Sequence, residues 1–315
     1  MINHLYFVLK LLRPRQWIKN FALFAAITFS GQLFDAANFF LVSTGFIAFC
    51  LLSSSTYIIN DLLDVNKDRL HPFKKNRPIV SGKVSINEAL FILFITLITA
   101  LVFSFSLGWF FLVIALLYLA LQLLYSLLFK TIAVFDILFI ASGYILRILA
   151  GAVLSNFSIS VWLLLTTISL SLFLATGKRR SELTLLQGVK KARINEIRKS
   201  LSHYSEPLLD SFSVIFATST FIFYTMFTFL ANPSGLQIEI DVLLPEFLPL
   251  DVLRRKWLMV TIIPVIYGIM RYLQDIYEKK EGESPDKVLM SDKPLLGAVI
   301  SWVLLVIFII YVLGG

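Results

Sequence analysis

Long apolar runs recur along most of the chain, separated by shorter polar segments. Each run approaches the roughly 20 residues that an α-helix needs to cross the hydrocarbon core of a bilayer. A helix can cross there because it satisfies its own backbone hydrogen bonds. The pattern predicts about nine spans, at residues 18–34, 38–59, 86–106, 108–129, 132–154, 159–177, 211–231, 256–275 and 294–313. We therefore expect an all-α, polytopic membrane helical bundle.

Composition agrees with this expectation. The chain has 315 residues, of which 58% are hydrophobic and only 15% are charged. A soluble globular protein of this size needs more polar surface than that. The single cysteine, Cys50, lies within an apolar run and excludes both an internal disulfide and a thiolate metal cluster. The first apolar run is flanked by basic residues but lacks a clear small-residue cleavage site, so we interpret it as a retained span.

Lysine and arginine gather in the segments of one side. Six lie in residues 60–85 and eight lie in residues 178–210. The opposite side carries only Arg254, Arg255 and Lys256. Because short loops rich in lysine and arginine stay in the cytoplasm, the pattern predicts a plasma-membrane protein with a cytoplasmic N-terminus. Any chemistry is then expected at the cytoplasmic face.

The segment NDLLDVNKDRLHPFKKNRPIVSG, residues 60–82, carries the candidate chemistry. If the preceding helix continues, Asn60, Asp64 and Asp68 share one face at spacing i, i+4, i+8, with Asp61 beside them. Clustered carboxylates repel one another unless a cation is bound, and hard oxygen ligands suit Mg²⁺ that also coordinates phosphate. Nearby cations provide charge-assisted contacts for a polyphosphate. The segment predicts a Mg²⁺-diphosphate site rather than a merely solvated loop.

The segment NDLLDVNKD is similar to the N-D-x-x-D-x-x-x-D motif of the UbiA superfamily of intramembrane prenyltransferases. RPIVSG resembles the motif that follows it there. Four further segments, LRPRQWIKN, YSLLFK, GYILRILAGA and ATGKRRSEL, resemble the decaprenyl-phosphate phosphoribosyltransferase branch. This resemblance implies a UbiA-like bundle, a Mg²⁺-dependent cytoplasmic site, and transfer of 5-phosphoribose from phosphoribosyl pyrophosphate to a polyprenyl phosphate.

One departure from the aromatic prenyltransferases of this superfamily bears on the branch. Those enzymes carry a second aspartate-rich motif after the sixth span. Here Lys178, Arg179 and Arg180 occupy that place, and Glu206 with Asp210 form a later acidic pair that is a weaker candidate for replacing the motif. Cations in this place suit a site that holds more phosphate than one prenyl diphosphate carries.

The expected site residues follow from these motifs and from the resemblance. Arg147 is included because a charged residue inside a span normally faces a cavity or a partner. For Arg15 and Lys19, a phosphate role and a membrane-interface role were equally favoured. The predicted catalytic residues are Asp61, Asp64 and Lys178, and the predicted metal ligands are Asn60, Asp61, Asp64 and Asp68. The predicted substrate-binding residues are Arg15, Lys19, Asn60, Lys74, Arg77, Tyr125, Lys130, Arg147, Arg179 and Glu182.

Three functions stay open at this point. The first is the phosphoribosyltransferase, with Mg²⁺ as cofactor and with a polyprenyl phosphate, phosphoribosyl pyrophosphate and the lipid bilayer as partners. A phosphate monoester acceptor is already anionic, so this reaction requires no general base. The alternatives are a prenyltransferase acting on an aromatic acceptor, and a transporter. No nucleic-acid partner is expected, and a homo-oligomer is left open.

The chain is expected to form a single transmembrane domain over residues 1–315, with two cytoplasmic segments capping the site. These segments are residues 60–87 and 178–210. Within the second, apolar residues recur with roughly helical period, which predicts an amphipathic helix at the membrane surface. Its closure over the donor as a lid is a hypothesis.

Overall fold

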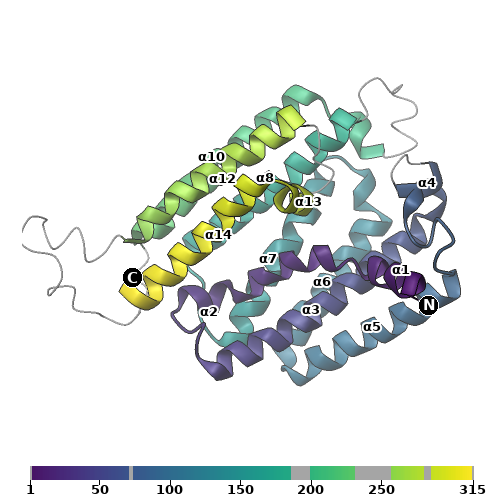
Figure 1. Cartoon of the computed structure of the whole chain (residues 1–315), viewed down its shortest axis with the longest axis horizontal. Helices are drawn as coiled ribbons and strands as arrows, with labels where there is room; N and C mark the ends of the chain where they lie inside the picture. The colour runs from purple at the N-terminus through teal and green to yellow at the C-terminus, as the bar shows by residue number, and fades with distance from the viewer. Residues whose placement is uncertain (1, 71–73, 186–198, 231–256, 280–284, 314–315) are drawn as a thin grey trace, which may run out of the picture. The chain divides into compact units, whose positions relative to one another are not determined.

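We analysed a computed structural model that describes residues 2–70, 74–185, 199–230, 257–279 and 285–313, in which every regular element is helical (Figure 1). The long helices are α3 (Ala36–Leu63), α5 (Ile86–Ser106), α6 (Trp109–Leu127), α7 (Phe135–Ser155), α8 (Val161–Leu185), α10 (Glu206–Leu230), α12 (Ile262–Gln274) and α14 (Lys293–Phe308). The shorter α-helices are α1 (Ile2–Leu12), α2 (Ala25–Phe29), α4 (Val65–Leu70) and α13 (Pro285–Ser291). Short 3-10 segments are η1 (Pro14–Phe24), η2 (Lys74–Asn76), η3 (Phe129–Thr131), η4 (Lys199–His203) and η6 (Trp257–Thr261), and π-helical turns are η7 (Asp275–Lys279) and η8 (Ile309–Leu313).

Eight helices in the described part of the chain are long and apolar enough to cross a membrane. They correspond to eight of the nine predicted spans, so the expected polytopic membrane bundle is confirmed and its count is close. The remaining run, residues 18–34, forms the end of η1 and then α2. This run carries Lys19 and the fully buried Asn20, and it changes helix type at Phe24. It is therefore not one continuous α-helix of spanning length.

The chain divides into two compact units. The first contains residues 1–23, 40–154 and 186–205, and the second contains residues 24–39, 155–185 and 206–315. The first unit holds most of α3 together with α5, α6 and α7, and the second holds α8, α10, α12 and α14.

In the first unit, small and aromatic residues bring the helices together. Phe49 of α3 packs against Tyr118 of α6 with ring centroids 5.3 Å apart. Ser55 of α3 donates a hydrogen bond to Thr96 of α5 at 2.9 Å. A Cβ atom at Gly151 of α7 would lie 1.9 Å from the Leu23 carbonyl oxygen, so only glycine permits this close approach of η1. These contacts join α3 to α5 and α6, and join α7 to η1.

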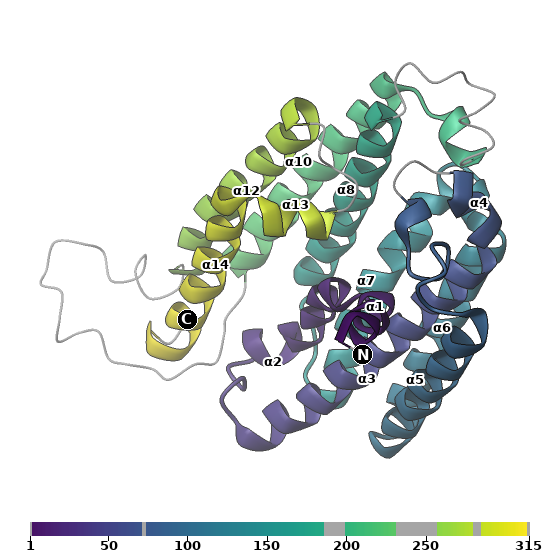
Figure 2. The same ribbon diagram turned by 45° about the vertical axis from the view of Figure 1, so that its right-hand side comes forward.

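In the second unit, α8 contacts α10, α10 contacts α12, and α12 contacts α14 (Figure 1 and Figure 2). Phe173 of α8 packs against Tyr272 of α12 with ring centroids 5.3 Å apart. Gly177 allows this packing, because a Cβ there would lie 2.7 Å from the Ile276 side chain and 2.8 Å from the Tyr272 hydroxyl. The chain segment that carries Lys178 to Glu182 is thereby held against α12.

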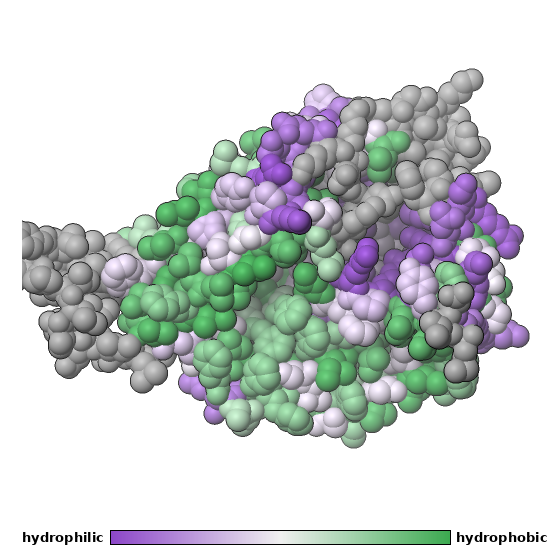
Figure 3. Space-filling model, viewed as in Figure 1, coloured by the Kyte–Doolittle hydropathy of each residue, from purple (hydrophilic) through white to green (hydrophobic). Residues whose placement is uncertain are grey.

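Large hydrophobic side chains cover the outside of the spanning helices, as the membrane assignment requires. Phe110 of α6 is 75% exposed and Phe105 of α5 is 71% exposed. In the space-filling view, hydrophobic residues cover the region of α14, whereas hydrophilic residues gather around α4 (Figure 3). α4 contains Asp68, the last aspartate of the acidic motif. The polar chemistry of the first unit is thus concentrated where α3 passes into α4.

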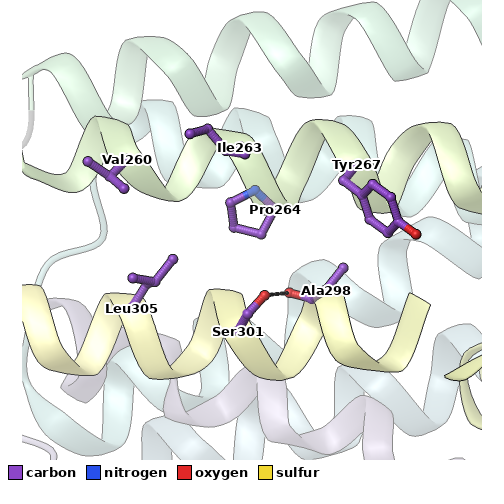
Figure 4. A pocket seen from close by; sticks show the side chains of 7 residues that line it. All are labelled: Val260, Ile263, Pro264, Tyr267, Ala298, Ser301 and Leu305. Atoms are coloured by element: carbon purple, nitrogen blue, oxygen red, sulfur yellow. Dashed lines mark hydrogen bonds between the residues drawn. The ribbon is translucent and has the colours of Figure 1, made fainter. Parts of the chain in front are cut away.

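An apolar groove of about 450 Å³ runs between the α12 and α14 segments of the second unit (Figure 4). Its lining residues are Val260, Ile263, Pro264, Tyr267, Ala298, Ser301 and Leu305. The Ser301 hydroxyl donates to the Ala298 carbonyl of its own helix at 2.9 Å. Since none of these side chains is charged, the groove does not have the chemistry of a diphosphate site.

Candidate active site

The acidic motif lies where α3 passes into α4. The Asp64 N–H donates to the Asn60 carbonyl at 3.0 Å, and the Asp68 N–H donates to the Asp64 carbonyl at 2.8 Å. These are helical i to i−4 bonds, so helical spacing continues across the short break between α3 and α4. The predicted continuation of the helix through the motif is therefore confirmed, and Asn60, Asp64 and Asp68 follow one another at successive turns.

Arg77 links two carboxylates of this motif. Its Nη1 atom lies 2.9 Å from Asp61 Oδ1 and 2.5 Å from Asp68 Oδ2. Both carboxylates are buried, with Asp61 1% and Asp68 4% exposed. A buried carboxylate needs such a charged partner, because removal from water strongly disfavours its ionised form. Arg77 follows the η2 turn and belongs to the RPIVSG segment that the sequence placed beside the motif.

Asp68 shows the opposing effects of burial and of nearby cations. Burial raises the pKa of the Asp68 carboxyl above its ordinary value, while Arg77 and Lys74 act in the opposite direction. Asp61 and Asp64 add to the increase, because a neighbouring negative charge disfavours ionisation. Burial is the largest of these effects, so the raised pKa reports first the cost of keeping this carboxylate ionised out of water.

A second basic residue at Asp61 is Arg13, which the sequence analysis did not include among the site residues. Arg13 Nη2 donates to Asp61 Oδ1 at 2.5 Å, and the guanidinium lies 4.8 Å from the ring centroid of Tyr57. Burial lowers the pKa of Arg13, but Asp61, Tyr57 and Asp68 together raise it by more, and the pKa lies above its ordinary value. The arginine therefore stays charged beside the motif.

The local sequence explains how Arg13 reaches this position. It follows the last residue of α1 and has φ of +54°, the left-handed conformation that often ends a helix and usually belongs to glycine. Pro14 comes next, which prevents the helix from continuing. The only signal in the sequence was this Arg-Pro step after an apolar helical run.

Lys130 completes the set of cations around the motif. It lies on η3, between α6 and α7, and its Nζ donates to both carboxylate oxygens of Asp64 at 2.6 and 2.8 Å. Both side chains are 15% exposed. This contact brings Lys130 beside the acidic motif, and its substrate-binding role stays a prediction. Tyr125 lies at the end of the same α6 helix and is partly buried.

Three carboxylates and three cations therefore form one cluster in the first unit, and every aspartate of the motif contacts a basic side chain. In the described part of the chain, no three acidic, histidine or cysteine side chains are grouped so that they alone could hold a metal ion. Mg²⁺, however, usually binds one or two carboxylates and takes phosphate oxygens and water as its other ligands. The all-oxygen donor set of Asp61, Asp64 and Asp68 fits a metal ion that binds together with a diphosphate.

Arg147 lies deeper in the first unit and is 4% exposed. Its Nε donates to Asn20 at 2.6 Å, its Nη1 donates to the Gly143 carbonyl at 2.7 Å, and its Nη2 donates to the Tyr118 hydroxyl at 2.9 Å. These three acceptors are neutral. Asn20 in turn donates to Cys50 and Ser53 of α3. Arg147 therefore ties α7 to η1 and α6, and Asn20 extends the connection to α3.

The two predicted cations of η1 lie in different settings. Arg15 is exposed. Lys19 donates to Gln16 at 2.5 Å, and the same oxygen accepts a hydrogen bond from Tyr57 at 3.2 Å. Tyr57 is the residue on which the Arg13 guanidinium lies. Lys19 is therefore connected to the motif through side chains, whereas the described contacts give no such connection for Arg15.

The predicted site residues at the end of α8 belong to the second unit. Arg179 is fully buried and donates to Glu182, one turn along. Lys178 is partly buried. The structure describes this unit by itself, so a joint site of Lys178, Arg179 and Glu182 with the acidic motif stays a prediction.

The Glu206 and Asp210 pair has a clear partner in the second unit. Arg180 donates to Asp210 and to Glu206, both at 2.8 Å, and the Tyr277 hydroxyl donates to Asp210 at 2.7 Å. The pair thereby joins α10 to α8 and to η7. This arrangement favours a structural role for Glu206 and Asp210 over a second metal-binding motif.

One prediction falls on residues outside the described ranges. The centre of the predicted amphipathic helix and lid, residues 186–198, lies in such a gap, so this helix stays a prediction.

Comparison with known proteins identifies the family. A model of the UbiA prenyltransferase family matches residues 21–290. The decaprenyl-phosphate phosphoribosyltransferase of Mycolicibacterium smegmatis is 35% identical over 302 residues, covering 94% of this chain and 90% of the relative. The enzyme of the same name from Corynebacterium glutamicum is 31% identical, covering 97% of this chain and 87% of the relative.

A solved structure shares the fold. A UbiA homolog from Archaeoglobus fulgidus, bound to GPP and Mg²⁺, matches with a TM-score of 0.67 and 21% sequence identity. The match covers 95% of this chain and 98% of that chain. Because only 21% of the residues are identical, this similarity establishes the helical fold alone.

Proposed function

Since the chain belongs to the UbiA prenyltransferase family, we propose that this multi-pass membrane transferase moves 5-phosphoribose from phosphoribosyl pyrophosphate to a polyprenyl phosphate and releases pyrophosphate. The relatives named decaprenyl-phosphate phosphoribosyltransferase, which match nearly the whole chain, support this choice of donor and acceptor. The observation that carries the proposal is the set of three basic side chains, Arg13, Arg77 and Lys130, held directly on the aspartates of the motif.

These ion pairs keep the cations in place for a polyanionic donor. A guanidinium forms strong, charge-assisted hydrogen bonds with phosphate oxygens, and a lysine ammonium supplies a compact positive charge. Arg77 and Lys130 are each held by carboxylates that also suit Mg²⁺. On donor binding, Asp61, Asp64 and Asp68 would hold the metal ion, and the basic side chains would turn to the phosphates. Mg²⁺ would supply charge neutralisation of the departing pyrophosphate.

The reaction itself is a substitution at the anomeric carbon. An oxygen of the lipid phosphate forms the new C–O bond, and the bond to pyrophosphate breaks, with the electron pair leaving on the pyrophosphate oxygen. The acceptor is already an anion near neutral pH, so no side chain has to remove a proton. Stabilisation of the leaving group by Arg77 and Lys130 is then the main contribution of the first unit to catalysis. We place Lys178 and Arg179 on the remaining phosphate groups, as the sequence motif implies.

The orientation follows from the same residues. The motif, Arg77 and Lys130 lie in polar segments rich in lysine and arginine, which stay on the cytoplasmic side. We therefore place the active site at the cytoplasmic face of the plasma membrane, with the N-terminus on that side. Phosphoribosyl pyrophosphate, a soluble anion, would reach it there.

The decisive experiment compares donors. Purified protein with Mg²⁺ is incubated either with labelled phosphoribosyl pyrophosphate and a polyprenyl phosphate, or with a labelled prenyl diphosphate and a phenolic acid. Label in the lipid fraction from the first mixture, and its loss in Asp64→Asn, is the expected result. Product from the second mixture alone would replace the proposal by aromatic prenyl transfer.

A further inference from the structure

The turn between α6 and α7 contains a backbone conformation that its residue type rarely adopts. Val134 has φ of +69°, in the left-handed region. For a β-branched residue this conformation is a genuine outlier, whereas glycine adopts it without steric conflict. Such a conformation persists only where the surrounding contacts impose it. The partners of Val134 therefore show what holds this turn.

Tyr204 supplies the contact. The Val134 N–H donates to the Tyr204 hydroxyl oxygen at 2.6 Å, and that hydroxyl donates to Asp136 Oδ1 at 2.7 Å. Ser200 donates to the other oxygen of Asp136 at 3.0 Å. Asp136 is fully buried and Tyr204 is 7% exposed. The hydroxyl therefore accepts and donates in a fixed direction, between the strained turn and a buried carboxylate.

The same turn carries Lys130. Lys130 lies on η3, and α7 begins at Phe135, so Val134 sets the direction in which the chain leaves η3. The Ile132 N–H donates to the Phe129 carbonyl at 3.1 Å, and the Phe129 ring stacks on Phe139 of α7 with centroids 4.3 Å apart. η3 is thus tied to the start of α7. A change of backbone angle at Val134 would move Lys130 relative to Asp64.

We propose that Tyr204 is a positioning residue: together with Asp136 it holds the left-handed turn at Val134, and thereby keeps the Lys130 ammonium on Asp64. The importance of this for phosphoribosyl transfer rests on the proposed function, in which Lys130 binds phosphate. The geometry itself does not depend on that function. Tyr204 comes directly after η4, so a segment 70 residues further along the chain controls the cation at the motif.

The first test measures the position of Lys130 without reference to catalysis. Full-length protein in lipid nanodiscs is treated with an amine-reactive acylating reagent, and modification of Lys130 is followed by mass spectrometry. Tyr204→Phe keeps the buried ring and removes only the hydroxyl. We expect Lys130 to be acylated about tenfold faster in this variant than in the wild type, and we expect the same of Asp64→Asn, which removes the charge that holds the ammonium. An unchanged rate in Tyr204→Phe would overturn the proposal.

A second substitution tests whether the effect passes through the turn. Glycine tolerates the φ of Val134 without the hydroxyl, so Val134→Gly combined with Tyr204→Phe should return Lys130 acylation most of the way to the wild-type rate. Failure of this rescue would contradict the route through Val134. Ser200→Ala is the matched control, because it removes the other donor to Asp136 and leaves the Tyr204 to Val134 contact. It should not change Lys130 acylation, and an increase equal to that of Tyr204→Phe would overturn the role given to Tyr204.

Kinetics then separate this inference from the proposed function. In Tyr204→Phe, kcat/KM for phosphoribosyl pyrophosphate should fall about tenfold, with most of the loss in kcat because Lys130 stabilises the departing pyrophosphate, and Val134→Gly should reverse the fall. If Tyr204→Phe does not fold, Asp136→Asn, which weakens the same anchor at nearly equal volume, takes its place in both measurements. A wild-type protein that transfers no phosphoribose, but shows the expected acylation pattern, would refute the proposed function alone.

Discussion

Arg13 Nη2 lies 2.5 Å from Asp61 Oδ1, although 48 residues separate the two in the chain. The arginine reaches the aspartate from a left-handed backbone conformation at the end of α1. The strained backbone of Arg13 thus places a positively charged guanidinium beside the Asp61 carboxylate, which is 1% exposed. Strain of this kind persists at functional sites because the side chain is needed there.

Backbone strain and side-chain charge at Arg13 can be separated by two substitutions. Arg13→Gly and Arg13→Ala both remove the guanidinium, but only glycine accepts a φ of +54° freely. We expect Arg13→Gly to be more stable than Arg13→Ala by about 1 kcal/mol, the typical penalty of a left-handed L-residue. Thermal unfolding in detergent measures the difference. Equal stabilities would show that the turn is not strained in solution.

Activity should distinguish Arg13 from its neighbour Arg15. Arg13→Gln removes a direct partner of Asp61, whereas Arg15 is exposed and has no described contact with the motif. We expect kcat/KM to fall more in Arg13→Gln than in Arg15→Gln, by about tenfold, which corresponds to ~1.4 kcal/mol. Both substitutions remove one positive charge, and the two residues are close together in the chain, so the variants differ mainly in the contact with Asp61. A larger loss in Arg15→Gln would support the predicted phosphate role of Arg15 and remove Arg13 from the site.

Substitution of Asn20 and substitution of its partner Arg147 should lower the stability of the protein by different amounts. Asn20→Ala leaves the buried guanidinium without one of its acceptors, and an unsatisfied buried charged group costs about 2–3 kcal/mol or more. Arg147→Met removes the charge itself, so that only neutral acceptors lose a donor and no uncompensated charge stays in the interior. We therefore expect Asn20→Ala to lower the melting temperature more than Arg147→Met does.

The double substitution provides the control for this pair. Asn20→Ala should be much less destabilising in an Arg147→Met background, since no guanidinium is then left unsatisfied. Additive effects would contradict a direct dependence of Arg147 on Asn20. Loss of transfer activity in Arg147→Met, with the melting temperature retained, would assign Arg147 to the site rather than to packing.

Periodicity and local motifs were enough to predict the helical membrane fold and the acidic segment at the end of α3. The length of each apolar run identifies a membrane span. The helical i, i+4 spacing of Asn60, Asp64 and Asp68 continues across the break before α4. Arg77 was predicted because it lies close in sequence to the aspartates, and Lys130 because its charge ends a span. These signals are local, and a single sequence contains them.

Long-range pairing was the part that the sequence did not reveal. Arg13 was one of several cations near the first apolar run, and nothing in their spacing marked it as the partner of Asp61. The contact of Asp136 with Tyr204 spans 68 residues and depends on how η4 packs against the start of α7. Hydropathy predicts a span at 18–34 but does not report that this run is divided between η1 and α2, with a change of helix type at Phe24.

Glu206 and Asp210 provide the last prediction, on metal dependence. Both accept hydrogen bonds from Arg180, so the structure favours a structural role for them, whereas Asp64 belongs to the predicted metal site. The Mg²⁺ concentration for half-maximal activity should therefore change less than about twofold in Glu206→Gln/Asp210→Asn, although the melting temperature falls as α10 loses its tie to α8. Asp64→Glu, which keeps the charge, should raise that concentration. A large increase in the Mg²⁺ requirement of the Glu206→Gln/Asp210→Asn variant would instead make this pair a second metal-binding motif, and would favour the prenyl diphosphate alternative.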